Sequence, residues 1–341
     1  MLITDIPAVQ KIIAQIGIKN VFKQLVEYLE TDFSNWEKFD KMPRPASHVP
    51  NGVIELMPVC GEKYYAFKYV NGHVPNQQKG ILTIVGMGVL SDVETGFPLL
   101  VSEMTLLTAL RTAATSAMSS KYLARKNSSK LGIIGCGAQS EFQLIAHLQF
   151  FDIKQIKYFD IDKKAMDKMA KNMSNFGIEL IPCKNAKDVA DGSDIIITVT
   201  AARGKNKILE ADWIVEGQHI CGIGGDCPDK TELDPELLKK SGVFVEFLKQ
   251  TIYEGDIQNL TSIEVENVVK AELWQVINGV KEGRVSDKDI TIFDSVGFAL
   301  EDYSVLRFIY EIILADKNLQ TNVDLIPENI QNCRDLYSLI S

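Results

Sequence analysis

The chain lacks the features that mark membrane, secreted or zinc-binding proteins. No apolar run approaches the roughly eighteen residues of a membrane span, and the N-terminus MLITDIPAVQ has neither the basic start nor the apolar stretch of a signal peptide. The six cysteines include no C-x-x-C pair, and the four histidines show no metal-ligand spacing. We therefore expect a soluble cytoplasmic protein that needs no metal.

Positive charge is also scarce. The chain has 36 Lys and Arg against 45 Asp and Glu, a net charge of −9, which argues against nucleic-acid or membrane-surface partners. It contains no G-x-S-x-G motif, no P-loop and no paired acidic helix motif, so hydrolase and kinase functions lack support. With 341 residues and 46% hydrophobic composition, it is long enough for two domains.

Residues 131–141, LGIIGCGAQSE, lead from an apolar strand through two glycines into a helix. Gly135 permits a tight turn, and Gly137 lets the backbone approach phosphate groups. The helix that follows, beginning near Ala138 and Gln139, presents free N–H groups and the positive end of its dipole. The segment therefore predicts a pyrophosphate site for a dinucleotide cofactor, although Ser140 stands where glycine or alanine is usual.

The next predicted strand, residues 156–160, ends in Asp160, 23 residues after Gly137. An acid at this spacing accepts hydrogen bonds from the adenosine ribose and favours NAD over NADP. Lys163 and Lys164 follow closely and leave room for NADP. The competing interpretation is a glycine-rich strand–helix turn with a capping aspartate.

From Lys130 onward, strands and helices alternate, which is typical of a doubly wound parallel sheet. We predict an α/β fold with a Rossmann-type NAD-binding domain over residues 126–299. Residues 1–125 and 300–341 are predicted to form a discontinuous α+β domain for substrate binding and dimerisation. The predicted strands are 131–135, 156–160, 178–182, 194–200, 219–223, 243–247 and 290–294, and the predicted helices are 138–150, 163–175 and 298–315.

The first 125 residues show a different pattern. The spacing of apolar residues predicts helices from about residue 6 and over 18–33, and an Ala/Thr-rich helix over 105–123. Between them, residues 53–59, 64–70 and 82–90 read as strands with no intervening helix, so an antiparallel sheet is expected here.

Two segments end strands at the sheet edge where ligands bind in such folds. Thr200 and Ala201 follow one strand and are expected to line the cofactor crevice, although ordinary capping explains either residue equally well. The segment ICGIGGDCPDK, residues 220–230, places Asp226 on a loop after three glycines. In an enclosed apolar crevice its carboxylate would exchange a proton near neutral pH; the alternative is a capping or loop-stabilising role.

Three cations stand in surroundings with little other charge. Lys68 lies in an aromatic strand, Arg111 in the Ala/Thr-rich helix, and Arg44 between two prolines. Together they could clamp one carboxylate; the competing interpretation is that each is a solvated surface charge. Glu55, in the middle of a predicted strand, has the same ambiguity.

The sequence resembles the ornithine cyclodeaminase and mu-crystallin family over nearly its whole length, and is most similar to the bacterial ornithine cyclodeaminases. The segments that carry the resemblance are ASH at 46–48, VIELMPV at 53–59, YAFKYVNGH at 65–73, ALRTAATS at 109–116, GAQSEFQ at 137–143, GGDCPDKTEL at 224–233 and DSVGFALEDY at 294–303.

The resemblance implies roles for particular residues. Asp226 matches the catalytic acid–base, Glu55 an active-site acid, and Lys68 a catalytic and substrate-binding cation. Arg44 and Arg111 match further substrate cations, and Val296 closes the pocket. The implied cofactor contacts are Thr83, Arg111, Gly135, Gly137, Ala138, Gln139, Asp160, Thr200, Ala201, Ile220, Cys221, Gly222, Ile223, Lys230 and Ser295.

The family also implies a homodimer and a reaction. NAD takes a hydride from the α-carbon of L-ornithine, Asp226 assists loss of an amine proton, and the δ-amine displaces ammonia. The cyclic imine then receives the hydride back as L-proline. Two alternatives stay open: an amino-acid dehydrogenase or ketimine reductase of the same family, and a non-catalytic dinucleotide- or ligand-binding protein like the crystallin branch.

Overall fold

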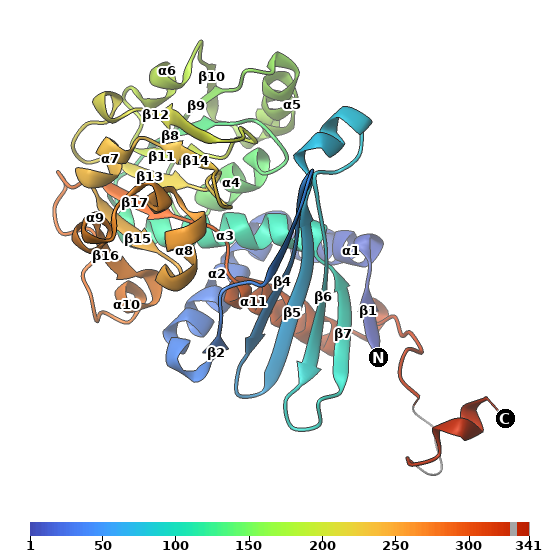
Figure 1. Ribbon diagram of the computed structural model, residues 1–341. Helices are drawn as coiled ribbons and strands as arrows, with labels where there is room; N and C mark the ends of the chain where they lie inside the picture. The colour runs from blue at the N-terminus through green and yellow to red at the C-terminus, as the bar shows by residue number, and fades with distance from the viewer. Residues whose placement is uncertain (328–332, 341) are drawn as a thin grey trace.

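The computed structural model describes residues 1–327 and 333–340 and contains two large sheets, seen at the upper left and lower right of Figure 1. The upper sheet has eight parallel strands in the order β10-β9-β8-β11-β13-β17-β15-β16. This confirms the predicted doubly wound α/β class. Its strands are β8 (Lys130–Ile134), β9 (Gln155–Phe159), β10 (Glu179–Pro182), β11 (Ile195–Thr198), β13 (His219–Gly222), β15 (Gly242–Val245), β16 (Val269–Glu272) and β17 (Thr291–Asp294).

The strand order reverses between β8 and β11, because β9 and β10 continue on one side of β8 and β13 and β17 on the other. Ligands bind at such a switch point, outside the carboxyl ends of the strands. The helices around this sheet are α4 (Ser140–His147), α5 (Lys163–Met173), α6 (Ala186–Ala190), α7 (Pro235–Lys239), α8 (Leu248–Glu254), α9 (Ser262–Val268) and α10 (Leu273–Ile277). β12 (Lys205–Leu209) and β14 (Thr231–Leu233) form a separate parallel pair.

The lower sheet has seven strands, antiparallel except where β1 joins β7. The antiparallel region is therefore confirmed, with β1, β2, β3 and β7 as strands that the sequence patterns did not predict. Its strands are β1 (Leu2–Thr4), β2 (Asp40–Lys41), β3 (Ala46–Val49), β4 (Gly52–Cys60), β5 (Tyr64–Gly72), β6 (Ile84–Asp92) and β7 (Pro98–Glu103).

Helix α11 (Ala299–Ala315) packs across β4, β5 and β6, although it follows the last strand of the other sheet in sequence (Figure 1). Helix α2 (Ile18–Ser34) packs against both α11 and α3 (Thr105–Leu123), and α3 also reaches β13 and β17 of the upper sheet. Helix α1 (Ile6–Ile16) begins where the Asp5 carboxylate accepts the N–H of Ala8 at 3.0 Å. The bounds of α3 agree with the prediction, while α4 is shorter than the expected 138–150.

One continuous apolar core joins the two sheets. It contains Leu25 of α2 and Leu306 of α11 together with Phe244 of β15 and Phe293 of β17. Trp36, after α2, stacks on Trp274 of α10 with ring centroids 6.2 Å apart. The lower and upper sheets are thus packed together through side chains and are not separated by a linker.

The chain has short 3-10 helices at Trp36–Lys38, Val74–Lys79, Ser174–Phe176, Ala211–Trp213, Asp256–Asn259, Lys317–Leu319 and Leu336–Leu339. Among the described residues, no helix is both long and apolar enough to span a membrane.

Candidate active site

The loop between β8 and α4 leaves space for a ligand. Gly135 has φ +103°, and a Cβ there would lie 2.5 Å from the carbonyl oxygen of Val199, so only glycine fits the turn. Gly137 differs, since a Cβ at its position would meet no protein atom within 4 Å. The chain therefore needs glycine at Gly135 for its own packing, whereas Gly137 faces open space.

The backbone at this loop offers hydrogen-bond donors. Within the described part of the chain, the N–H groups of Gly137, Ala138 and Gln139 donate to no protein acceptor. They precede α4, whose dipole adds positive potential at the same point. The hydroxyl of Ser140 donates to the carbonyl of Gly137 at 2.8 Å. The unusual residue of the motif therefore stabilises the turn through a hydrogen bond within it. This arrangement fits the pyrophosphate of a dinucleotide.

Asp160 lies beside the same loop. Its carboxylate accepts the N–H of Cys136 at 2.7 Å and that of Asp162 at 2.8 Å. Next along the sheet, Thr200 is half-buried after β11, and Ala201 is exposed. The strand β13 supplies the buried residues Ile220, Cys221 and Gly222, followed by Ile223. The structure therefore places these predicted cofactor residues along the carboxyl ends of β9, β11 and β13.

The three predicted cations are buried and paired, so their interpretation as solvated surface charges is wrong. Lys68 lies on the covered face of the lower sheet, 2.8 Å from Asp302 of α11. Arg111 contacts the same carboxylate at 3.0 Å and also pairs with Glu301. Burial, joined by the charge of Arg111, lowers the pKa of Lys68 to about 8, against the opposing effect of Asp302.

Arg44 connects the two halves of the site. Its guanidinium lies 3.1 Å from Glu55 of β4 and 2.9 Å from Glu254 of α8. It also donates to the carbonyl oxygens of Asp226 at 2.5 Å and Val296 at 3.3 Å. One side chain from the segment between β2 and β3 thus contacts three segments near the upper sheet. Glu55 is buried, which settles the face of β4 on which it lies.

Asp226 lies in different surroundings from those expected. Its side chain is 41% exposed and pairs with Lys230 at 2.9 Å, so the expected enclosed apolar environment is wrong. The reason is local, because the turn from Cys227 to Lys230 brings a lysine of the same loop against the carboxylate. Asp229, at the third position of this turn, has φ +60°, where glycine is usual.

The remaining predicted residues lie just after β17 and just before β6. Ser295 and Val296 follow β17 and are buried, and the Ser295 hydroxyl donates to Glu246. Thr83 is half-buried just before β6, and its carbonyl accepts the N–H of His73 at 2.8 Å.

Sequence reasoning named Glu55 but missed the other three acidic partners of the cations, Glu254, Glu301 and Asp302. Glu301 and Asp302 stand together near the start of a mostly apolar helix, and that acidic pair was a usable signal. Glu254 ends a short helix and carried no comparable signal. Burial raises the pKa of Glu254, while the charge of Arg44 opposes the shift.

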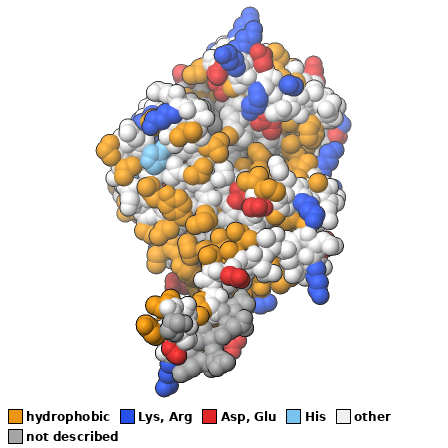
Figure 2. Space-filling view, turned by 90° about the vertical axis from the view of Figure 1, so that its right-hand side faces the viewer, with side chains coloured by type: hydrophobic (Ala, Val, Ile, Leu, Met, Phe, Trp, Pro, Cys, Tyr) orange, Lys and Arg blue, Asp and Glu red, His pale blue; other side chains and the backbone are white. Residues whose placement is uncertain are grey.

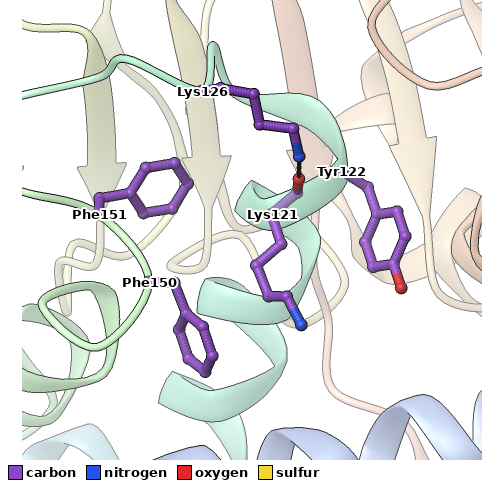
Figure 3. A pocket seen from close by; sticks show the side chains of 5 residues that line it. All are labelled: Lys121, Tyr122, Lys126, Phe150 and Phe151. Atoms are coloured by element: carbon purple, nitrogen blue, oxygen red, sulfur yellow. Dashed lines mark hydrogen bonds between the residues drawn. The ribbon is translucent and has the colours of Figure 1, made fainter.

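A pocket of about 280 Å³ lies elsewhere, between the C-terminal end of α3 and the residues after α4 (Figure 3). It is about 15 Å along α3 from Arg111. Lys126 donates to the carbonyl of Lys121, and Lys121 itself pairs with Glu30 at 2.5 Å. Because both ammonium groups already have protein partners, we do not include this pocket in the candidate site. It is lined by Lys121, Tyr122, Lys126, Phe150 and Phe151.

Comparisons with known proteins agree with the fold. The sequence profile of the ornithine cyclodeaminase/mu-crystallin family matches residues 8–317. An ornithine cyclodeaminase from Agrobacterium fabrum is 48% identical over 324 residues, which cover 95% of this chain and 90% of that protein.

Two solved structures have the same fold over nearly the whole chain. An archaeal alanine dehydrogenase dimer with bound NAD is 35% identical, with a TM-score of 0.88 over 96% of this chain and 99% of that one. A lysine cyclodeaminase, solved to explain its recognition of L-lysine, L-ornithine and L-2,4-diaminobutyric acid, is 27% identical. Its TM-score is 0.90, with 99% of each chain covered.

Proposed function

The chain belongs to the ornithine cyclodeaminase/mu-crystallin family, and from that membership we propose that it is an ornithine cyclodeaminase. It would convert L-ornithine to L-proline and ammonia with NAD as a cofactor that is used and restored in each turnover. The observation that carries the proposal is the 48% identity, over 95% of the chain, with a protein of that name.

The charges of the site favour a substrate with two amines. Three buried cations, Arg44, Lys68 and Arg111, face four carboxylates, those of Glu55, Glu254, Glu301 and Asp302. The cluster therefore has one net negative formal charge, apart from the neutral pair of Asp226 and Lys230. Ornithine carries one net positive charge and alanine carries none, so ornithine balances the site and alanine does not.

The same residues suggest how the substrate is held. We assign its carboxylate to the cations Arg44, Lys68 and Arg111, and the guanidinium groups can bind it through two parallel hydrogen bonds. A substrate fixed at that end has its side-chain amine confined near its own α-carbon, which raises the effective concentration of the amine for ring closure.

Asp226 is assigned the proton transfers. Its carboxylate lies on the loop after β13, and its partial exposure lets it exchange protons with water. When bound, NAD supplies a hydride acceptor for the α-carbon and returns the hydride after ring closure. The residues proposed to hold it are the free amides of Gly137, Ala138 and Gln139, together with Asp160 and Thr200 and the other predicted cofactor contacts.

The decisive experiment uses L-ornithine with a trace of NAD⁺. Proline and ammonia should form in equal amounts and in large excess over the cofactor. Stoichiometric accumulation of NADH without proline would instead identify a dehydrogenase, the activity named for the archaeal relative. Asp226→Asn should abolish turnover and leave NAD binding intact; unchanged turnover would contradict the assigned role of Asp226.

We also propose that the protein is a cytoplasmic homodimer that pairs through the open face of the lower sheet. Leu56, Tyr69 and Met87 form a row across β4, β5 and β6, and they are 46%, 37% and 50% exposed. Figure 2 shows hydrophobic side chains gathered over much of the side of the molecule that it displays. Exposed apolar patches of this kind are typical of protein interfaces.

A further inference from the structure

Glu232 lies buried directly beneath the glycine-rich loop that carries Asp226. One of its carboxylate oxygens accepts the N–H of Thr200 at 2.8 Å and also the hydroxyl of the same residue. A Cβ on Gly224 would overlap this carboxylate, so the loop backbone rests against it. Glu232 therefore connects the end of β11, where cofactor contacts are expected, with the loop after β13.

A second buried carboxylate holds Glu232 in place. Asp256 accepts the N–H of Glu232 at 2.6 Å and that of Leu233 at 2.8 Å. The N–H of Asp256 is in turn donated to Asp294 at 2.9 Å. Within the described residues, Oε2 of Glu232 and Oδ2 of Asp256 are buried without a hydrogen-bond partner. The two unpartnered oxygens show that this layer is not fully satisfied in its ionised form.

Lys230 stands between this layer and Asp226. Its ammonium lies 2.9 Å from Asp226, and its charge also acts on Glu232 and Asp256. The backbone of the turn is fixed, since Gln258 accepts the N–H of Asp229 at 2.7 Å and donates to the carbonyl of Lys230 at 3.3 Å. The part of this turn that can move is therefore the flexible side chain of Lys230, whose ammonium can shift between Asp226 and Glu232.

The groups that face Glu232 decide its protonation. The charges that act on it directly are those of Lys230 and Asp256. Asp226 in turn pairs with Lys230, and Asp294 acts on Asp256. Burial raises the pKa of Glu232 to about 7, while the hydrogen bond from Thr200 and the charge of Lys230 oppose the shift. Both protonation states are then populated near neutral pH.

We propose that Glu232 is a positioning residue for Asp226 that acts through Lys230. When Glu232 is ionised, it draws Lys230 toward itself and leaves the Asp226 carboxylate free to accept a proton. When Glu232 is protonated, Lys230 stays on Asp226 and weakens it as a base. This inference rests on the proposed function, in which Asp226 is the acid–base group.

The first test is the pH profile of Glu232→Gln. Glutamine keeps an oxygen for Thr200 but mimics the protonated acid at every pH. We expect its kcat to show no acid limb from pH 6 to 7.5 and to be about tenfold below wild type at pH 8.5, with KM for ornithine and Kd for NAD within about threefold. Glu103→Gln is the matched control, because Glu103 also accepts backbone N–H groups, at the start of α3, and its pKa is also raised by burial. An acid limb that persists in Glu232→Gln overturns the inference.

The second test needs no substrate. A carboxyl group whose folded pKa is raised binds more protons in the folded state, so wild type loses stability as pH rises from about 4.5 to 7. The Tm of Glu232→Gln minus that of wild type should therefore grow between pH 5 and 8. A constant difference overturns the inference. If wild type makes no proline at any pH while the difference still grows, the proposed function fails but the titration of Glu232 is supported.

Discussion

Asp302 compensates two buried cations at once, which makes Asp302→Asn a sharp test of the site's electrostatics. The carboxylate lies 2.8 Å from Lys68 and 3.0 Å from Arg111, and all three side chains are at most 6% exposed. Removing one partner from a buried ion pair typically costs about 3–5 kcal/mol. The structure allows this cost to be divided between the two cations.

Lys68 can release its proton, which lowers the free-energy cost of removing its partner. With a pKa of about 8, keeping it charged in the folded protein costs about 3 kcal/mol relative to the ordinary lysine value. Neutralising an ordinary lysine at pH 7 costs about 5 kcal/mol, and the step from a pKa of about 8 down to pH 7 accounts for one unit of this, so Asp302→Asn adds at most about 1.4 kcal/mol through Lys68. Arg111 cannot release its proton, and losing one charged hydrogen bond adds about 1.5–3 kcal/mol.

The pH dependence follows from the sign of the shift. A lysine whose folded pKa is lowered binds fewer protons in the folded state, so wild type gains stability from Lys68 as pH rises from about 8 to 10.5. At pH 9 Lys68 is largely neutral in both proteins. The deficit of Asp302→Asn should therefore shrink by about 1.4 kcal/mol between pH 7 and pH 9.

Urea unfolding of the cofactor-free protein, at one protein concentration and at both pH values, measures these differences. Asp152→Asn is the matched control, because its pair with Lys154 is exposed, and we expect it to cost less than about 0.5 kcal/mol. If Asp302→Asn costs less than about 1 kcal/mol at pH 7, Asp302 does not compensate two charges. An equal deficit at both pH values would refute the account of Lys68.

Three further outcomes are expected. Gly135→Ala should lower the free energy of unfolding by about 1–3 kcal/mol. Gly137→Ala should change the free energy of unfolding by less than about 0.5 kcal/mol but weaken NAD binding in calorimetry. Equal stability losses in the two variants would contradict the packing difference between the two glycines. Asp160→Ser should weaken NAD relative to NADP by about tenfold in binding titrations, and an unchanged ratio would count against its ribose contact. Met87→Lys should yield monomers in light scattering, unlike Val215→Lys at an apolar residue that is at least as exposed, 60% against 50%; a dimer that persists would point to another interface.

Local pattern was sufficient for the elements with strong periodicity. The bounds of α3 and the strands around the Gly135 loop could be read from sequence because apolar spacing and glycine positions act within a few residues. β1 has only three residues and pairs with β7 about 100 residues further along the chain, so the main evidence for it is a distant partner. No local signal reports such a pairing.

In the candidate site, too, some residues could be predicted from local sequence and others could not. The cations could be nominated because charge is conspicuous in an apolar segment. Which acid pairs with which cation could not be read from the sequence, since Lys68 and Asp302 are 234 residues apart in sequence and Arg111 and Glu301 are 190 apart. The position of Asp226 was also misjudged, because its burial depends on how the turn to Lys230 folds. The assigned roles and the domain bounds stay predictions.

The apolar core shared by the two sheets bears on how substrate reaches the crevice. Opening the molecule about a hinge would pull Trp36 away from Trp274 and expose core side chains, at about 25 cal/mol for each Å² of apolar surface. Rearrangement of surface loops exposes far less, and the Asp226 turn and the segment before β6 border the opening. Substrate entry and product release should then depend on loop motion on the nanosecond-to-microsecond scale. Raising the solvent viscosity should slow these steps less than it would slow a rotation of whole domains.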